Sequence, residues 1–427
     1  MTVSKLYRLF TEAKTHVNTF SWESFLESLG GEKRIHYSLE NLLEALREAG
    51  HPEKSVKSLV IAGTNGKGST TLFISEALKR HGYRVATYLS PHLQHLRERF
   101  QDGLVPWSLE RLKKHVEALA PLAEKWKLSY FEFLTLIFFE DSAQTKPNFN
   151  ILEVGMGGRL DATNVTSPLG VVLTNISWDH TEYLGNTLEK ILREKMGVLR
   201  PSVPVISGLK AAGLKNGLQN ECEKLCSPLY FADSLSRKVI KKNWSGQEVV
   251  IDGHSFSLKN PSEGALENAI GSYLFLRKIF PEIAIPTIQA AFASMVNPGR
   301  LEIVQENPRI ILSGDHNLAG MQSLTDTLRE LGATDLHVLC GFGPDKDASG
   351  MIQALKPFAK ELVLTRVVRA RGQYDKVYQT LAKYEADPQK AFLELRKKLK
   401  AHDTLLVTGS LYLVGEIREL FRTIGSV

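Results

Sequence analysis

The feature that most constrains this 427-residue chain is a glycine-rich loop placed between an apolar segment and a helical one. Ser58 to Gly63 has the composition of a buried strand, and Ser69 to Arg80 has that of a helix that stops at His81-Gly82. Glycines let backbone N–H groups close around phosphate oxygens, and the helix N-terminus adds a partial positive charge. The sequence therefore predicts a nucleoside triphosphate site formed by Gly63, Thr64, Asn65, Gly66, Lys67, Gly68 and Ser69.

Lys67 is the residue of this loop that can bridge the outer phosphates. The loop departs from the common P-loop pattern, because Ile61 stands where the first glycine is expected and Gly68 separates Lys67 from the hydroxyl of Ser69. The alternative is a tight strand-to-helix turn that carries an exposed lysine. Three glycines and two hydroxyl groups in one loop favour the phosphate site.

Apolar, β-rich segments alternate with helical patterns along the chain, which is typical of a parallel sheet covered by helices. We expect an α/β fold with a P-loop-type, mainly parallel ATPase domain over residues 1–296 and a smaller Rossmann-like domain over residues 297–427. The turn-forming residues 297–300 suit a hinge between them. Further strands are expected at 83–90, 149–155, 170–177, 203–208, 309–315, 336–342, 361–367 and 404–409, and helices at 188–199, 265–279 and 389–401.

Charge and hydropathy exclude several classes of function. The formal charge of +6 is spread without a single-sign block or a nucleic-acid-binding fingerprint, so it favours small anionic ligands. Met1 to Phe20 lacks the apolar run of a signal peptide, and Phe133 to Phe139 is far shorter than the roughly 20 residues that span a bilayer. Of the three cysteines, Cys222 and Cys226 could share a helix face and bind a metal, but packed thiols are the commoner outcome. We expect a cytoplasmic protein with no nucleic-acid or membrane partner.

Three side chains follow predicted strands at the edge where ligands of open α/β sheets gather: Ser90, Glu153 and His180. A hydroxyl, a carboxylate and an imidazole beside a phosphate loop form a plausible shell for a divalent metal. Each also has a structural explanation, since Ser90 precedes Pro91 in a turn and His180 follows Asp179 as a candidate helix cap.

The loop and several later segments resemble the folate branch of the Mur ligase superfamily, the folylpolyglutamate synthase/dihydrofolate synthase family. These motifs occur in the family's order over nearly the whole chain. They are Gly-Thr-Asn-Gly-Lys-Gly-Ser (63–69), Tyr-Leu-Ser-Pro-His-Leu (88–93), Glu-Val-Gly-Met-Gly-Gly-Arg-Leu-Asp-Ala-Thr-Asn (153–164), Asp-His-Thr-Glu-Tyr-Leu-Gly (179–185), Arg-Glu-Lys-Met-Gly (193–197), Pro-Gly-Arg (298–300) and Gly-Ser-Leu-Tyr (409–412).

This resemblance implies an ATP-dependent, ADP-forming ligase that joins L-glutamate to a carboxylate through an acyl phosphate. It also implies two Mg²⁺ ions, with Ser90 and Glu153 matching the ligands of one ion and His180 contributing to the second. Mn²⁺ could substitute, because imidazole is an unusual ligand for Mg²⁺. Lys195 matches a lysine that is carbamylated in the family, although its neighbours Arg193 and Glu194 would otherwise indicate a solvated helix face.

The resemblance also places Asn268, Arg300 and Ser313 at the ATP site, and it makes Lys67, Lys195, His180 and Arg300 the catalytic set. Ser313 departs from the family, which has Asp at this position. If 309–315 is a strand, Asp315 lies on the same face about 6.6 Å away and could replace the missing carboxylate. The alternative is that Asp315 caps a helix that begins near His316.

The acceptor-binding residues implied by the resemblance are His36, Tyr37, Ser129, Phe131 and Leu160. Phe131 and its neighbour Tyr130 can equally be core residues, because large aromatic side chains usually fill interiors. His36 stands where dihydropteroate-using members carry Asp, and it cannot accept hydrogen bonds as a carboxylate does.

Three acceptor assignments therefore remain open: polyglutamylation of a tetrahydrofolate, this together with ligation to dihydropteroate, or an unusual acceptor. The competing hypotheses are a cell-wall ligase of the same superfamily and a nucleotide-binding protein with impaired catalysis, the latter prompted by Ser313. The expected partners are small molecules, and the family implies a monomer.

Overall fold

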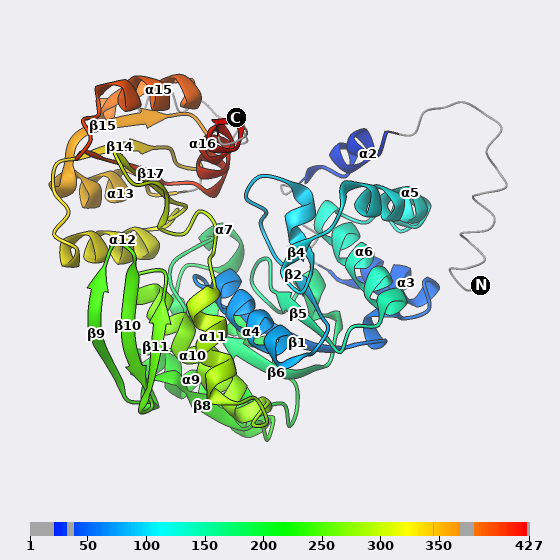
Figure 1. The fold of residues 1–427 in the computed structure, drawn as a ribbon. Helices are drawn as coiled ribbons and strands as arrows, with labels where there is room; N and C mark the ends of the chain where they lie inside the picture. The colour runs from blue at the N-terminus through cyan, green and yellow to red at the C-terminus, as the bar shows by residue number, and fades with distance from the viewer. Residues whose placement is uncertain (1–20, 32–37, 345, 368–379, 425–427) are drawn as a thin grey trace.

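The computed structural model describes residues 21–31, 38–344, 346–367 and 380–424. Their strands form an eight-stranded sheet, a three-stranded sheet and a six-stranded sheet (Figure 1). All strands of the six-stranded sheet follow Leu301, and the exact domain boundary before residue 297 stays a prediction. No helix in the described ranges is long and apolar enough to cross a membrane.

The eight-stranded sheet has the order β4-β3-β2-β5-β1-β6-β7-β8. Neighbours from β2 to β8 pair in parallel, whereas β3 and β4 add an antiparallel edge. The strands are β1 (Lys57–Ala62), β2 (Val85–Tyr88), β3 (Phe100–Asp102), β4 (Val105–Pro106), β5 (Phe149–Glu153), β6 (Pro168–Leu173), β7 (Val205–Ser207) and β8 (Leu229–Phe231).

Helices cover both faces of this sheet (Figure 1). They are α2 (Trp22–Ser28), α3 (Glu40–Glu48), α4 (Lys67–His81), α5 (Leu109–Lys125), α6 (Tyr130–Thr145), α7 (Thr181–Leu184), α8 (Leu188–Met196), α9 (Ala212–Lys224), α10 (Glu263–Ile279) and α11 (Ile285–Ser294). Short 3₁₀ turns join them at η2 (Pro52–Lys54), η3 (Leu96–Arg99), η4 (Ala162–Val165) and η5 (Ala232–Ser234).

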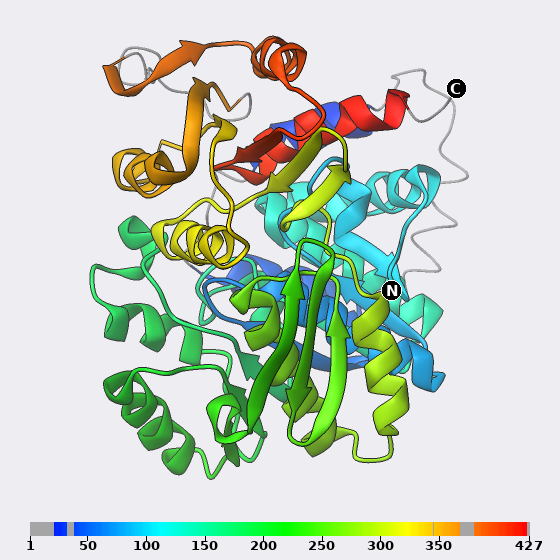
Figure 2. The same ribbon diagram turned by 60° about the vertical axis from the view of Figure 1, so that its left-hand side comes forward.

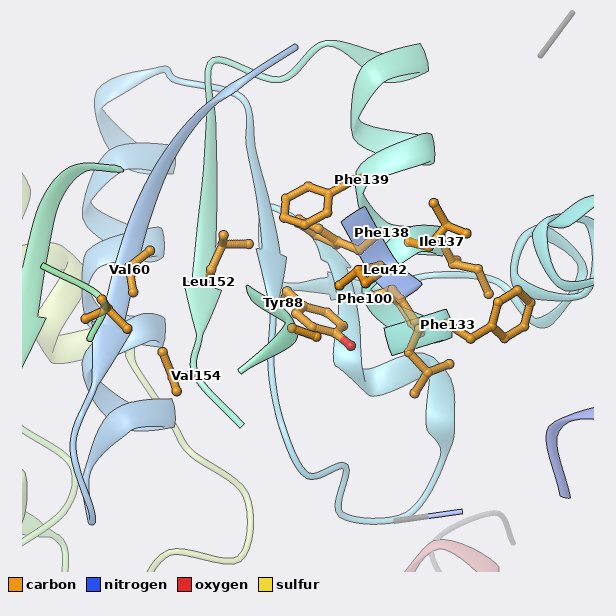
Figure 3. Packing of buried hydrophobic residues seen from close by; sticks show 14 of the residues in the cluster. Leu42, Val60, Tyr88, Phe100, Phe133, Ile137, Phe138, Phe139, Leu152 and Val154 are labelled. Carbon is orange, nitrogen blue, oxygen red and sulfur yellow. The ribbon is translucent and has the colours of Figure 1, made fainter. Parts of the chain in front are cut away.

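Strand β1 is central, and its side chains alternate between two hydrophobic cores. Val60 joins the core that contains Phe133 and Phe138 of α6, as Figure 3 shows. Leu59 and Ile61 join the opposite core, which is formed with α4, α10 and α11. Burial on both faces explains why this strand is apolar throughout rather than alternating with polar residues.

The three-stranded antiparallel sheet consists of β9 (Arg237–Asn243), β10 (Gly246–Ile251) and β11 (His254–Leu258). It covers α10 and α11, because Val249 and Phe256 share a core with Phe292 (Figure 2). None of these three strands was predicted from the sequence. Strand β9 is exposed along nearly its whole length, so it lacks the apolar pattern that marked the other strands.

The six-stranded sheet has the order β12-β13-β17-β14-β15-β16, parallel except for β12. Its strands are β12 (Glu302–Gln305), β13 (Arg309–Ser313), β14 (Leu336–Cys340), β15 (Ala359–Thr365), β16 (Lys383–Glu385) and β17 (Thr404–Thr408). The helices are α12 (Leu318–Glu330), α13 (Ala348–Leu355), η6 (Lys356–Phe358), α15 (Pro388–Lys398) and α16 (Leu411–Ile424). This confirms the predicted α/β fold with a second, smaller α/β unit.

Each predicted strand and helix overlaps an observed one, but the ends differ. Helix α4 begins at Lys67 rather than at the predicted Ser69, because Gly66 with a φ of 84° already ends the loop. Strand β13 ends at Ser313, two residues before the predicted end.

Candidate functional site

The glycine-rich loop joins β1 to α4. Hydrogen bonds to the segment that follows β6 hold it in place. Thr64 N–H donates to the Asn175 carbonyl, and Asn65 N–H donates to the Asn175 side chain, both at 2.9 Å. Gly63 has a φ of 141°, and a Cβ atom there would lie 1.9 Å from Thr174 Oγ1. This close approach explains why the loop requires glycine at that position.

The N-terminus of α4 supplies the donors for an anion. Thr70 N–H makes the first bond of the helix, to the Gly66 carbonyl, so the N–H groups from Lys67 to Ser69 have no partner within the helix. Lys67 is the first residue of this helix, and its Nζ turns back to the loop, where it donates to the Thr64 carbonyl at 3.0 Å. These groups form the partial positive charge that binds phosphate at helix N-termini.

Lys195 reaches the loop from α8 and is only 4% exposed. Its Nζ donates to the Gly63 carbonyl at 2.7 Å. The interpretation of this residue as part of a solvated helix face is therefore wrong. Burial, aided by the nearby Lys67 charge, lowers the pKa of Lys195 to about 7. A large share of the amine is consequently neutral near pH 7.

Ser90 and Glu153 meet where β2 and β5 end, beside the first turn of α4. Ser90 N–H donates to Glu153 Oε2 at 3.0 Å, and a Cβ atom on Gly68 would lie 3.4 Å from the same oxygen. Burial raises the pKa of Glu153, although Lys67 and the Ser90 N–H oppose that rise. Within the described residues, the buried Ser90 Oγ has no hydrogen-bond partner.

This pair fits a hard divalent cation, because an unpartnered buried hydroxyl and a carboxylate belong to residues in contact beside the phosphate donors. In the described part of the chain, no three His, Cys, Asp or Glu side chains are grouped closely enough to hold a metal alone. Cys222 and Cys226 are free thiols, the first buried and the second exposed, as expected for packed or idle thiols rather than for a shared metal site. A cation at Ser90 and Glu153 would take its remaining ligands from the nucleotide and water.

His180 and Asp179 lie in the segment between β6 and α7. His180 occupies the position before α7 in a left-handed conformation, and its side chain makes no capping bond, so the helix-cap alternative is wrong. Its Nε2 lies 3.8 Å from Asp179 Oδ1. Lys346 of the second domain donates to the same carboxylate oxygen at 2.6 Å. Burial opposes ionisation of Asp179, but His180 and Lys346 hold its pKa well below the usual range.

Asn317 joins the phosphate loop to the second domain. Its Oδ1 accepts from Gly320 N–H at the start of α12 and from Asn65 Nδ2, while its Nδ2 donates to Asn65 Oδ1 at 2.9 Å and to Asp179 Oδ2 at 3.0 Å. Asn317, which is 4% exposed, therefore uses all four hydrogen-bonding positions of its amide. The alternative in which Asp315 caps this helix is wrong, because Asn317 is the cap.

Asn268 and Arg300 are further residues of the predicted ATP site. A Cβ atom on Gly66 would lie 2.1 Å from Asn268 Oδ1, so the Asn268 amide touches the loop directly. Arg300 donates to the Gly314 carbonyl at 3.1 Å, and its charge acts on Glu153.

Ser313 is buried at the end of β13 and donates to Asp315 Oδ2 at 2.7 Å. Asp315 lies beyond the strand, so the same-face geometry predicted for the pair is wrong. The contact itself keeps a carboxylate next to Ser313.

Of the predicted acceptor residues, Phe131 lies beside the segment after β5, where a Cβ atom on Gly155 would lie 2.7 Å from its ring. Ser129 caps α6 through a reciprocal pair of bonds with Glu132, which makes its hydroxyl structural in this conformation. The Phe131 ring is half-buried and stacks on Tyr88 at 5.8 Å. Leu160 is half-buried in the loop after β5. His36 and Tyr37 lie outside the described residues.

Sequence reasoning assigned no role to several polar residues of this site, foremost Asp161, Asn317 and Lys346. Asp161 is 6% exposed, accepts from Met156 N–H at 2.8 Å, and has its pKa raised by burial. Asp161 stood within a recognised motif, and Asn317 within the altered segment 313–318, so both could have been singled out. Nothing local marks Lys346, because its partner Asp179 is 167 residues away.

Comparison with known proteins agrees with this geometry. Residues 61–272 match the Mur ligase middle domain, and residues 299–411 match the Mur ligase glutamate ligase domain. The dihydrofolate synthase/folylpolyglutamate synthase of Bacillus subtilis is 30% identical over 89% of this chain and 94% of its own length. The Escherichia coli protein of the same description is 30% identical over 94% of each chain.

Solved structures superpose over most of the chain. Escherichia coli FolC in complex with DHPP and ADP has a TM-score of 0.84 and 28% identity, and the match covers 96% of this chain and 100% of FolC. Thermotoga maritima folylpolyglutamate synthase has a TM-score of 0.81 and 28% identity, with 94% and 97% covered. The chain therefore belongs to the dihydrofolate synthase/folylpolyglutamate synthase family of Mur ligases.

Proposed function

We propose that this protein is an ADP-forming ligase that uses ATP to join L-glutamate to the carboxylate of a folate, of dihydropteroate, or of both. The observation that carries the proposal is the convergence of Lys67, Glu153 and Lys195 around the N-terminus of α4. The relatives that span nearly the whole chain are named for these two activities.

The nucleotide would bind with its outer phosphates on the N–H groups of Lys67 to Ser69 and on the Lys67 ammonium. Lys67 Nζ would exchange its bond to the Thr64 carbonyl for a phosphate oxygen. Asn268 touches the loop, and the charge of Arg300 acts on Glu153, so both would complete the nucleotide site together with Ser313 and Asp315.

The γ-phosphoryl group is transferred to the acceptor carboxylate, which gives an acyl phosphate and ADP. The glutamate amine then attacks the acyl carbon, loses a proton and displaces phosphate, so that an amide forms. Both steps concentrate negative charge on oxygen, and the fixed charges of Lys67 and Arg300 stabilise it without reorganisation. Closure of the second domain over the site would exclude water from the acyl phosphate.

Ser90 and Glu153 would hold one Mg²⁺, and His180 would contribute to a second, with Mn²⁺ as a possible substitute. Bound at these residues, the ions supply charge neutralisation for the phosphates. We also propose that Lys195 is carbamylated. Support comes from its pKa of about 7, since the neutral amine is the form that reacts with carbon dioxide. The product is an anionic carbamate in place of a cation.

Acceptor recognition would fall to Phe131, Leu160 and Ser129, together with His36 and Tyr37. The exposed part of the Phe131 ring, at the site end of α6, suits a flat heterocycle. Ser129 would act mainly by fixing the start of α6, because Glu132 occupies its hydroxyl.

The test is a ligation assay with purified protein, ATP, Mg²⁺, glutamate and either dihydropteroate or tetrahydrofolate, read by phosphate release and product mass. We expect acceptor-dependent phosphate release and a mass gain of one glutamate. Lys67→Met should abolish turnover, whereas Lys79→Met, at an exposed position of the same helix, should not. Tight ATP binding without turnover for any acceptor would contradict the proposal and support impaired catalysis instead.

A monomeric state and a cytoplasmic location stay predictions. Light scattering after size exclusion and cell fractionation test them.

A further inference from the structure

The loop that follows Ser90, residues 91–95, lies against the last helix of the second domain (Figures 1 and 2). Leu93 packs on the core that contains Leu405 and Val414. Gly415 is buried in the middle of α16, and a Cβ atom there would lie 2.0 Å from the Leu93 carbonyl oxygen. The contact is backbone to backbone, so no side-chain rotation could relieve that overlap.

Polar groups of the same helix hold the next residue of the loop. Arg418 Nη1 donates to Gln94 Oε1 at 2.7 Å, and Gln94 Nε2 donates to Glu419. Arg418 also donates to both carboxylate oxygens of Glu302 at 2.9–3.1 Å. Glu302 in turn accepts from the Gly299 N–H at 2.8 Å. One arginine therefore joins the loop to the segment that connects the two domains.

Glycine inside a helix is less favourable than alanine, so its use at Gly415 needs a compensating contact. The close approach of the Leu93 backbone to Gly415 is that contact. Ser90 directly precedes the loop, and its N–H donates to Glu153, so the position of the loop on α16 also sets Ser90 and Glu153 relative to the second domain.

We propose that Gly415 and Arg418 are positioning residues that seat the 91–95 loop when the two domains close, and thereby place Ser90 and Glu153 for phosphoryl transfer. The inference rests on the proposed ligase function for its catalytic consequence. The contact between the loop and α16 is itself present in the structure, whether or not the protein ligates.

The test compares Gly415→Ala with Gly213→Ala, a glycine-to-alanine change in helix α9 where a Cβ atom would meet nothing within 4 Å. Both variants should remain folded, because alanine favours helix, and circular dichroism checks this. We expect Gly415→Ala to lower kcat at least about tenfold, which is about 1.4 kcal/mol, and to leave the KM of the acceptor nearly unchanged. It should also increase the radius of gyration measured by X-ray scattering, because the domains cannot close fully. Gly213→Ala should match the wild type in both measurements.

Arg418→Gln is the second variant, since it removes the link to Gln94 and Glu302 without adding volume. Like Gly415→Ala, it should lower kcat and increase the radius of gyration. Arg418→Lys should restore part of the lost kcat. Wild-type kcat and scattering in both Gly415→Ala and Arg418→Gln would overturn the proposal. If the wild type does not ligate, the proposed function fails. The radius of gyration of the variants, compared with that of the wild type, then decides alone whether Gly415 and Arg418 position the 91–95 loop.

Discussion

Replacing Gly66 by alanine perturbs the nucleotide site in two separable ways. Gly66 has a φ of 84°, a conformation that costs an L-residue about 1–2 kcal/mol. The new Cβ atom would also lie 2.1 Å from Asn268 Oδ1, so the Asn268 amide must leave its place beside the loop. The matched control is Gly82→Ala at the other end of α4, where φ is 106° and a Cβ atom meets nothing within 4 Å.

Both variants should lose about 1–2 kcal/mol of unfolding free energy in urea titrations. Only Gly66→Ala should also bind ATP more weakly. A hydrogen bond to a charged group contributes about 1.5–3 kcal/mol, so displacement of Asn268 should raise the Kd for Mg-ATP, measured by calorimetry, about ten- to a hundredfold. Equal ATP affinity in Gly66→Ala and Gly82→Ala would refute the reasoning, because strain alone would then account for the change.

Three further outcomes are expected. Lys346→Met should destabilise the protein by up to about 3–5 kcal/mol at pH 7, because the buried Asp179 then loses its ion pair with Lys346 and keeps only the hydrogen bond from Asn317 and the nearby imidazoles. Since the pKa of Asp179 is lowered in the folded state, this stabilisation is present above about pH 4 and is lost as the pH falls, so urea titrations of variant and wild type should converge in acid. Lys195→Met should abolish ligation, and ¹³C-labelled bicarbonate should give a carbamate NMR signal in the wild type only. Phe131→Ala should raise the KM of the acceptor severalfold, with the Kd for ATP unchanged, because its ring stacks on Tyr88 at the start of α6.

Local sequence determined much of the first domain. The apolar run that became β1, the glycines after it and the helix that follows are neighbours in the chain, so composition alone indicated a phosphate-binding turn. Ser90, Glu153 and His180 were singled out because the ends of parallel strands meet at one edge of a sheet, and the structure brings Ser90 and Glu153 together. Strand β9 escaped detection because its solvent-exposed side chains leave no alternating pattern to read.

Only the tertiary structure decided which distant groups meet. The Asn65–Asn317 pair joins residues 252 positions apart, and no local pattern predicts that one amide will satisfy the other. The same holds for Gly415, which as sequence is an ordinary helix glycine and becomes informative only when Leu93 occupies the space beside it. Backbone propensity and hydrophobic periodicity act over a few residues, whereas burial, the resulting pKa of Lys195 and contacts between domains depend on how completed elements pack.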